Sequence, residues 1–576
     1  MAATKTFTTA SLLLAALLAL RANAAPPAVD TTFPYTGPAI PVGDWVDPTV
    51  KGNGKGFQRV VEPPAVAPKS AHVTNNINVI SLSYIPAGIN VHYQTPFGLG
   101  VAPSLKWGSS RTSLKHVATG SSRTYDRTPS CSLAAVTQCS QFFHDVQIKN
   151  LASNTVYYYQ IEAANGTTTS EVMTVHHCSE FTIGILNDMG YTNAKGTHEQ
   201  LINAITDGTS FLWHGGDISY ADDWYSGILP CASDWPVCYN GSSSELPGGL
   251  DNPDYLTPLP EGEIADQGGP RGGDISSIYE SNWDLWQQWI NIITTKVPYM
   301  VLPGNHEASC GEFDGPGNIM TAYLNDDESN TTVAESSLTY YSCPPSQSLR
   351  EPLRMPGNES GGVDSFWYSF DYGLAHFISL NTETDYANSP EFPFVADLTG
   401  DETHPAEDQT FITDSGPFGA IDGSFKDNTA YEQYQWLKAD LAAVDRTKTP
   451  WIVINSHRPM YSSGTASYQA HIRTAFQSLM LDAGVDVYIA GHIHWYERLF
   501  PLTINGTIDS ASIVDDHTYY TNEGVSIAHI VNGMAGNIDK LTINATALKF
   551  QFVLGLNGTV ADELVILKRM RQAQAE

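Results

Sequence analysis

Five short stretches of this sequence carry side chains that can bind metal ions or move protons. They are Asp188-Met-Gly190, Gly216-Asp-Ile-Ser-Tyr220, Gly304-Asn-His-Glu307, Asn455-Ser-His457 and Gly491-His-Ile-His494. An isolated Asp-x-Gly or Gly-Asp pair is ordinary turn chemistry, whereas Gly-Asn-His-Glu and Gly-His-x-His are more specific. Together the five supply carboxylates, a phenol, an amide and imidazoles, from Asp188, Asp217, Tyr220, Asn305, His457, His492 and His494.

Each of these stretches follows an apolar run of strand length. The runs are 181–186, the run that starts at Phe211, 299–302, 451–454 and 485–490. Short apolar runs bounded by turn residues are typical of buried strands. Because α/β sheets place their ligands outside the carboxyl ends of strands, we expect the five stretches to meet at one site.

The donor set suits two metal ions better than one. His492 and His494 are two residues apart, so their side chains can point to opposite sides of a turn and bind different ions. Asp217 is a candidate bridge, because a carboxylate can bind two cations at once. The order of the five motifs, each after a strand, argues against coincidence.

The chain around this site is expected to consist of an arm, two domains and a C-terminal segment. Residues 25–70 are rich in Pro and Gly and indicate an extended arm. From 71 to 177, short alternating runs separated by turn residues predict an all-β sandwich. From 178 to 512, strands alternate with amphipathic helices, which predicts an α/β domain with a mixed sheet. The strand-like segment 513–576 is expected to pack on that domain.

The helix candidates of the α/β region are 282–293, 432–444 and 473–481, where apolar residues recur at helical spacing. Two long insertions, 222–280 and 384–430, are rich in Gly, Pro and Asp. Loops of that length are either functional rims or mobile surface, and both interpretations stay open.

Residues 1–24 are expected to be a signal peptide. Lys5 precedes an apolar run over 10–20, and Ala22-Asn-Ala24 supplies small residues at a cleavage spacing. The run is too short to span a bilayer, so we expect a secreted protein, extracellular or in the cell wall, without a membrane anchor. N-linked glycans are expected at the sequons Asn165, Asn240, Asn330, Asn358, Asn505, Asn544 and Asn557.

Seven cysteines fit an oxidising compartment. Their spacing favours disulfides 131–139, 231–238 and 310–343, with Cys178 left over. The formal net charge is −32, from 29 basic and 61 acidic side chains. Such a surface argues against binding nucleic acid. It also repels an anionic substrate at neutral pH, and less so in acid.

The ordered motifs resemble those of the calcineurin-like metallophosphoesterases, and Tyr220 narrows the resemblance to the purple acid phosphatases. Ser365-Phe-Trp-Tyr-Ser-Phe-Asp-Tyr-Gly373 and Trp495-Tyr-Glu-Arg498 are similar to secreted fungal members. The resemblance covers most of the mature chain. It implies a fibronectin-III-like β-sandwich at 71–177 and a metallophosphoesterase catalytic domain, a β-α-β sandwich of two sheets, at 178–512.

The resemblance also implies roles for individual residues. Asp188, Tyr220 and His494 would hold Fe(III), and Asn305, His457 and His492 would hold a divalent ion (Zn, Mn or Fe). Asp217 would bridge the two. A phenol with a pKa near 10 is a poor ligand for most divalent ions, but a trivalent cation binds it as phenolate.

By the same resemblance, metal-bound hydroxide would attack a phosphomonoester, and the enzyme would be an acid phosphatase. His306 resembles the family histidine that contacts phosphate and assists departure of the alcohol. His471 is a second catalytic candidate, and a solvated residue at a helix start is its alternative interpretation.

Two other functions remain as alternatives. A phytase or a phosphodiesterase would use the same site with different rim loops. A catalytically silent secreted binding glycoprotein would keep the fold and lose at least one ligand, yet all seven are present.

Overall fold

The computed structural model describes residues 79–85, 87–95, 102–123, 142–152, 155–161, 169–172, 180–190, 194–220, 286–287, 289–308, 367–382, 429–463, 472–534 and 537–569. The expected signal peptide 1–24, the arm 25–70, all seven cysteines and His471 lie outside these residues. So do the insertion 222–280 and nearly all of 384–430.

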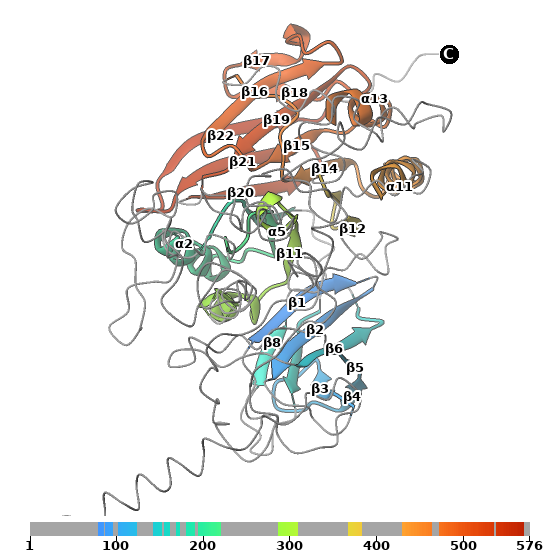
Figure 1. Cartoon of the computed structure of the whole chain (residues 1–576), viewed down its shortest axis with the longest axis vertical. Helices are drawn as coiled ribbons and strands as arrows, with labels where there is room; N and C mark the ends of the chain where they lie inside the picture. The colour runs from blue at the N-terminus through green and yellow to red at the C-terminus, as the bar shows by residue number, and fades with distance from the viewer. Residues whose placement is uncertain are drawn as a thin grey trace, which may run out of the picture.

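The N-terminal domain consists of two antiparallel four-stranded sheets, ordered β1-β2-β6-β5 and β4-β3-β7-β8 (Figure 1). Alternate residues of β2, among them Ile89, Val91 and Tyr93, join Leu105 and Tyr159 in the core. This period of two is the one that the sequence predicted. The strands are β1 (Val79–Ile85), β2 (Gly88–Thr95), β3 (Ser104–Gly108), β4 (His116–Thr119), β5 (Ser121–Arg123), β6 (Phe142–Lys149), β7 (Tyr157–Ile161) and β8 (Thr169–Val172).

The catalytic domain contains two larger mixed sheets. One is eight-stranded, ordered β11-β10-β9-β20-β21-β22-β18-β17, and the other is six-stranded, ordered β12-β13-β14-β15-β19-β16. The eight-stranded sheet comprises β9 (Glu180–Leu186), β10 (Leu212–Gly215), β11 (Tyr299–Leu302), β17 (Ile513–Asp515), β18 (Thr518–Tyr520), β20 (Asn537–Asn544), β21 (Ala547–Leu554) and β22 (Val560–Leu567). The six-stranded sheet comprises β12 (Tyr368–Tyr372), β13 (Ala375–Leu380), β14 (Trp451–Ser456), β15 (Val487–Ala490), β16 (Tyr496–Thr503) and β19 (Ser526–Asn532).

The two sheets pack face to face through aromatic side chains. The Phe211 and Phe377 ring centroids are 5.3 Å apart, and Trp213 Nε1 donates to Ser379 Oγ at 2.9 Å. Tyr368 donates its hydroxyl to the Val301 carbonyl at 2.8 Å. Trp213 and Tyr368 thus bury large rings between the sheets while their own polar atoms are hydrogen-bonded.

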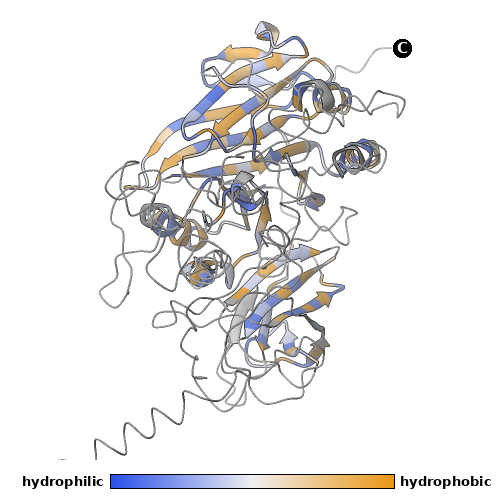
Figure 2. Cartoon of the chain, in the orientation of Figure 1, coloured by the Kyte–Doolittle hydropathy of each residue, from blue (hydrophilic) through white to orange (hydrophobic). Residues whose placement is uncertain are grey.

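The strands that precede the motifs form parallel pairs and are almost fully buried, although β9 also pairs antiparallel with β20. β10 pairs in parallel with β9 and β11, and β14 pairs in parallel with β13 and β15. Figure 2 shows orange, hydrophobic segments along the strands in the upper part of the molecule, where Figure 1 labels β14 and β15. Strands buried on both faces give continuous apolar runs, which explains why these segments showed no polar alternation in the sequence.

Helices cover the outer faces of the sheets. Leu201 and Ala204 of α2 (Lys195–Thr206) belong to the core of the eight-stranded sheet. Leu437 of α11 (Thr429–Ala443) and Met480 of α13 (Ser478–Asp482) pack with Ile454 of the six-stranded sheet. A π-helical turn (Arg473–Gln477) precedes α13, and residues 286–287 and 289–294 are also helical. The predicted helices 432–444 and 473–481 are therefore confirmed with shifted ends, the second beginning as a π-helical turn, and the described residues of 282–293 are helical.

Strand β1 joins the two domains. Ile80 donates its N–H to Asn291 Oδ1 at 2.7 Å and accepts from Thr294 Oγ1 at 2.6 Å. The Tyr84 ring lies 5.6 Å from Phe211 and 5.4 Å from Tyr372. The aromatic core between the catalytic sheets thus extends into the N-terminal sheet, which ties the β-sandwich to the strand that leads to Asp217.

A charged cluster joins α11 to β12 and β13. His376 Nδ1 lies 2.6 Å from Asp371 Oδ1, and its Nε2 lies 2.9 Å from Asp440 Oδ2. Asp440 also accepts from Ser369 Oγ at 2.6 Å. Burial disfavours the imidazolium, but the two carboxylates overcome it and raise the pKa of His376 to about 9.

We expect His376→Gln to lower the free energy of unfolding by about 1–3 kcal/mol near pH 5, because it removes two charge-assisted hydrogen bonds. The folded-state pKa exceeds the unfolded value near 6.5, so the stabilisation is complete below pH 6.5 and disappears as pH rises through 9. Urea unfolding of both proteins from pH 5 to 10 measures this. An equal stability difference at both ends of that range would contradict the ionic cluster.

Candidate metal centre

The described motif residues converge at the carboxyl ends of strands from both catalytic sheets. Asp188 follows β9, Asp217 follows β10, and α5 (Asn305–Ala308) follows β11. His457 and His492 follow β14 and β15 of the facing sheet. The sequence predicted strand ends that meet at one site, and the structure confirms this with one addition: the strands come from two sheets.

Tight backbone turns aim the side chains at each other. In the part of the chain that the structure describes, positive φ values outside glycine occur at Ala87 and Asn150 and at four of the motif residues. Such values are costly for side chains with a Cβ and concentrate at functional sites. The four are Asp188 (φ 53°), Asp217 (φ 49°), Tyr220 (φ 51°) and His492 (φ 66°).

Two of the motif glycines are required by close approach. A Cβ on Gly304 would lie 2.2 Å from Asp217 Oδ1, and a Cβ on Gly491 would lie 2.3 Å from Asp188 Oδ2. Only glycine lets these turns approach the carboxylates so closely. This explains why a glycine precedes the Asn-His-Glu and His-Ile-His segments.

One group of donors consists of Asp188, Asp217 and His494, whose ligand atoms lie within 4.8 Å of one another. The Tyr220 hydroxyl is adjacent, 2.9 Å from His494 Nε2 and 3.3 Å from Asp188 Oδ1. Asp188 is also fixed from the backbone, because His492 N–H donates to both of its oxygens at 3.1 and 2.9 Å.

The second group consists of Asp217, His457 and His492. His457 Nε2 lies 3.3 Å from Asp217 Oδ1 and 3.2 Å from His492 Nδ1. His457 Nδ1 lies 3.1 Å from the Gly215 carbonyl oxygen. A carbonyl can only accept, so Nδ1 carries the proton and Nε2 presents a lone pair to the cluster.

The charges of the cluster fit bound cations. Burial raises the pKa of Asp188. It acts the same way on Asp217, but His457 and His306 override it and hold the pKa of that carboxyl well below its usual range. Burial and the Arg458 guanidinium lower the pKa of His492, so its imidazole is neutral. Two buried carboxylates need positive charge close by, which either protonated imidazoles or bound cations can supply, so the donor set fits a metal pair that shares Asp217.

Of the two catalytic candidates, the structure describes His306 but not His471. His306 donates its backbone N–H to Asp217 Oδ1 at 3.1 Å, and its Nε2 is 3.8 Å from Asp217 Oδ2. Its ring lies 4.3 Å from that of Tyr220, at the cluster. Asn305 begins α5 beside it, and only its backbone is described. His471 lies outside the described residues.

Glu307 supports the site through hydrogen bonds, a role that was not predicted from the sequence. Its carboxylate accepts the N–H groups of Gly304 and Asp217 at 2.9 Å and of Ile218 at 2.8 Å. Burial and the neighbouring Asp217 raise its pKa to about 7. The available signal was a carboxylate three residues after Gly304, the spacing of a capping interaction.

Arg458 is the second residue at the site whose role was not predicted from the sequence. It is fully buried, and its Nη1 lies 3.0 Å from His492 Nε2. Its backbone N–H donates to Thr382 Oγ1 at 2.9 Å. A cation beside the His492 imidazole raises the local positive potential, which favours an anionic substrate. Only its position next to His457 could have drawn attention to it.

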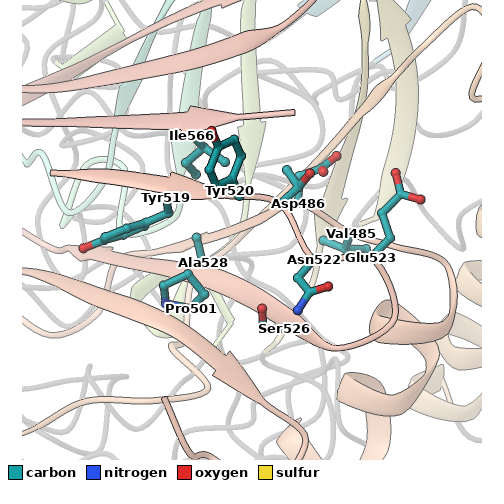
Figure 3. A pocket seen from close by; sticks show the side chains of 11 residues that line it. Val485, Asp486, Pro501, Tyr519, Tyr520, Asn522, Glu523, Ser526, Ala528 and Ile566 are labelled. Atoms are coloured by element: carbon teal, nitrogen blue, oxygen red, sulfur yellow. The ribbon is translucent and has the colours of Figure 1, made fainter. Parts of the chain in front are cut away.

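A pocket at the opposite end of β15 is not this site. Asp486, which precedes β15, lines it with Tyr519, Tyr520 and Glu523 (Figure 3). Asp486 accepts from Lys568 at 2.7 Å and from Arg446 at 3.3 Å. Both cations also contact Glu523. Its acidic groups are therefore used to fix the C-terminal strand β22 and its extension.

Comparison with known proteins agrees with this arrangement. Residues 75–177 match the model of the purple acid phosphatase N-terminal domain, and residues 251–496 match that of calcineurin-like phosphoesterases. An acid phosphatase of Aspergillus ficuum is 61% identical over 97% of this chain and 98% of its own length. A phosphate-repressible acid phosphatase of Aspergillus niger is 34% identical over 88% of this chain and 90% of its own.

A solved structure shows the same fold at low identity. The purple acid phosphatase from yellow lupin (Lupinus luteus) seeds matches with a TM-score of 0.55 and 20% identity, covering 85% of this chain and 74% of that one. With the full-length similarity to fungal acid phosphatases, these matches show that the chain belongs to the purple acid phosphatases, a family of calcineurin-like metallophosphoesterases.

Proposed function

We propose that this acid phosphatase is a secreted enzyme that hydrolyses phosphomonoesters at a dinuclear Fe(III)–M(II) centre. The observation that carries the proposal is the pair of ligand groups that share Asp217. Asp188, Tyr220 and His494 would hold Fe(III), and Asn305, His457 and His492 would hold Zn, Mn or Fe as the divalent ion. The catalytic domain would be 178–512, with 513–576 completing its sheets.

The donor chemistry supports one trivalent and one divalent ion. The Tyr220 hydroxyl lies against Asp188 and His494, and a phenolate there favours a trivalent cation. Two aspartates and one phenolate leave a ferric–divalent pair with a net charge of about +2, which suits a phosphate dianion. When bound, such a pair polarises phosphoryl oxygens and makes hydroxide available as a nucleophile in acid.

The chain's own residues position the reaction and move its protons. Without metal, His457 and His306 hold the pKa of Asp217 well below its usual range; with metal, the two cations would take over that part and the Asp217 carboxylate would bridge them. The His306 imidazole, next to Asp217 and Tyr220, would contact the phosphate and give a proton to the departing alcohol oxygen. His471 remains a second candidate for that proton.

Secretion is supported by the N-terminal pattern and by the sequons. Asn505 and Asn557 are exposed, which suits glycosylation. Asn544 is half-buried, and its Oδ1 accepts from the backbone of Thr546 and Ala547, so it suits a glycan less. In the described part of the chain, no helix is long and apolar enough to cross a membrane.

A substrate panel tests the proposal against its alternatives. The purified protein, loaded with iron and zinc, would be assayed at acid pH on phosphomonoesters, phosphodiesters and phytate. We expect phosphomonoesters to be hydrolysed most efficiently. A preference for phytate or for diesters would favour the alternative hydrolases, and absence of turnover in the fully metallated protein would favour a silent binding glycoprotein.

Asp217→Asn and His306→Ala separate metal binding from proton transfer. We expect the first to lose proper occupancy of both metals, because the shared ligand is gone. We expect the second to keep both metals and to lower kcat by about 10²–10⁴-fold, the usual contribution of a general acid. Metal analysis and kinetics on both variants measure this, and equal metal loss in the two would contradict the separate roles.

Glu307→Gln tests the support of the site. An amide can accept some of the three N–H bonds of Glu307 but presents its own N–H₂ to another, so the turns that carry Asp217 and Asn305 should loosen. We expect metal affinity to fall by about 10–100-fold, as is usual for residues that hold metal ligands in place by hydrogen bonds. Metal release to a chelator measures it, with Glu199→Gln on the exposed side of α2 as the matched control. Unchanged release would refute the supporting role.

A further inference from the structure

Trp495 is more exposed than the other tryptophans among the described residues. Its side chain is 39% exposed, whereas Trp213, Trp286, Trp367 and Trp451 are almost fully buried in the core. Leaving more than a third of an indole in water forfeits part of the hydrophobic gain of burial. An exposed tryptophan next to a reactive site therefore needs a separate explanation.

The position of Trp495 is the rim of the ligand cluster. It directly follows His494, whose side chain is itself 59% exposed while its Nε2 lies 3.3 Å from Asp188 Oδ1. The exposed His494 and Trp495 thus lie on the turn at which a side chain of the cluster reaches the surface. A phosphomonoester with its phosphate at the cluster would leave its ester group at this rim.

The indole is anchored to the neighbouring loop. Trp495 Nε1 donates to Glu497 Oε2 at 3.4 Å. Glu497 in turn accepts from the Ser463 N–H, at 3.0 Å to Oε1 and 3.2 Å to Oε2. Ser463 belongs to the loop that carries His457, and β14 and β15 are adjacent parallel strands. The ring is therefore fixed between the two loops that supply histidines to the cluster.

The chain around Trp495 keeps the ring outside the core. The next residue, Tyr496, stacks on Phe552 with ring centroids 4.0 Å apart and donates its hydroxyl to Asp562 at 2.7 Å. The backbone N–H of Trp495 donates to the Ile493 carbonyl at 2.7 Å. With Tyr496 packed inward and the turn closed, Trp495 presents a pre-oriented aromatic surface, which lowers the entropy cost of binding a flat group.

We propose that Trp495 determines substrate preference by stacking on the leaving group of aryl phosphomonoesters. This inference rests on the proposed function of the site. Stacking adds affinity for planar aromatic esters and none for small alkyl esters, because only the former cover the ring face. Trp495 contacts no reacting atom in this account, so its effect is on KM more than on kcat.

The test compares Trp495→Ala and Trp495→Phe with the wild type, each with its metal content measured. Phenylphosphonate and methylphosphonate serve as non-hydrolysable competitive inhibitors, and phenyl phosphate and glycerol 2-phosphate as substrates. In Trp495→Ala we expect the Ki of phenylphosphonate to rise about three- to tenfold, with that of methylphosphonate changed less than about twofold. Trp495→Phe should recover most of the difference.

The outcomes distinguish this inference from the function on which it rests. A wild-type enzyme that hydrolyses neither substrate would overturn the proposed function itself. If the wild type hydrolyses both and Trp495→Ala weakens both inhibitors equally, the stacking role is wrong. Metal loss in Trp495→Ala would likewise overturn it, since the residue would then support His494 instead of the substrate.

Discussion

The buried carboxylate of Asp217 is the constraint on which the rest of this structure depends. It belongs to both ligand groups, and burial alone would oppose its ionisation. His457 and His306, which come from different sheets, counter that effect, and Glu307 holds the Asp217 backbone N–H. The two sheets must therefore be packed in this relative position for the Asp217 side chain to be ionised and to point into the cluster.

That requirement explains the packing between the sheets. The Trp213–Ser379 and Tyr368–Val301 hydrogen bonds hold the two layers together close to the ligand-bearing strand ends. The N-terminal β-sandwich contributes through Tyr84, which extends the aromatic core beside Phe211. Its position thus supports the strand that leads to Asp217, so we infer a stabilising role for this domain.

Much of the site could be predicted from sequence because its signal is local. Asp188, Asp217 and His492 each follow a buried strand within a few residues, and strand ends converge by geometry. Arg458 was missed for the opposite reason, since its partner His492 is distant in sequence. Glu307 has a local partner in Gly304, but its contacts with Asp217 and Ile218, which make it part of the site, are also distant in sequence. The arrangement as two facing sheets was implied by the family resemblance alone, since apolar runs do not reveal which strands pair.

The most direct test of the ferric–phenolate centre is a visible absorption spectrum of the purified protein and of Tyr220→Phe. The Tyr220 hydroxyl, 2.9 Å from His494 Nε2, should give a broad purple or pink charge-transfer band when it binds Fe(III) as phenolate, and the variant should lose it. A colourless wild-type protein with two divalent metals at full occupancy, or a variant that stays purple, would contradict this assignment.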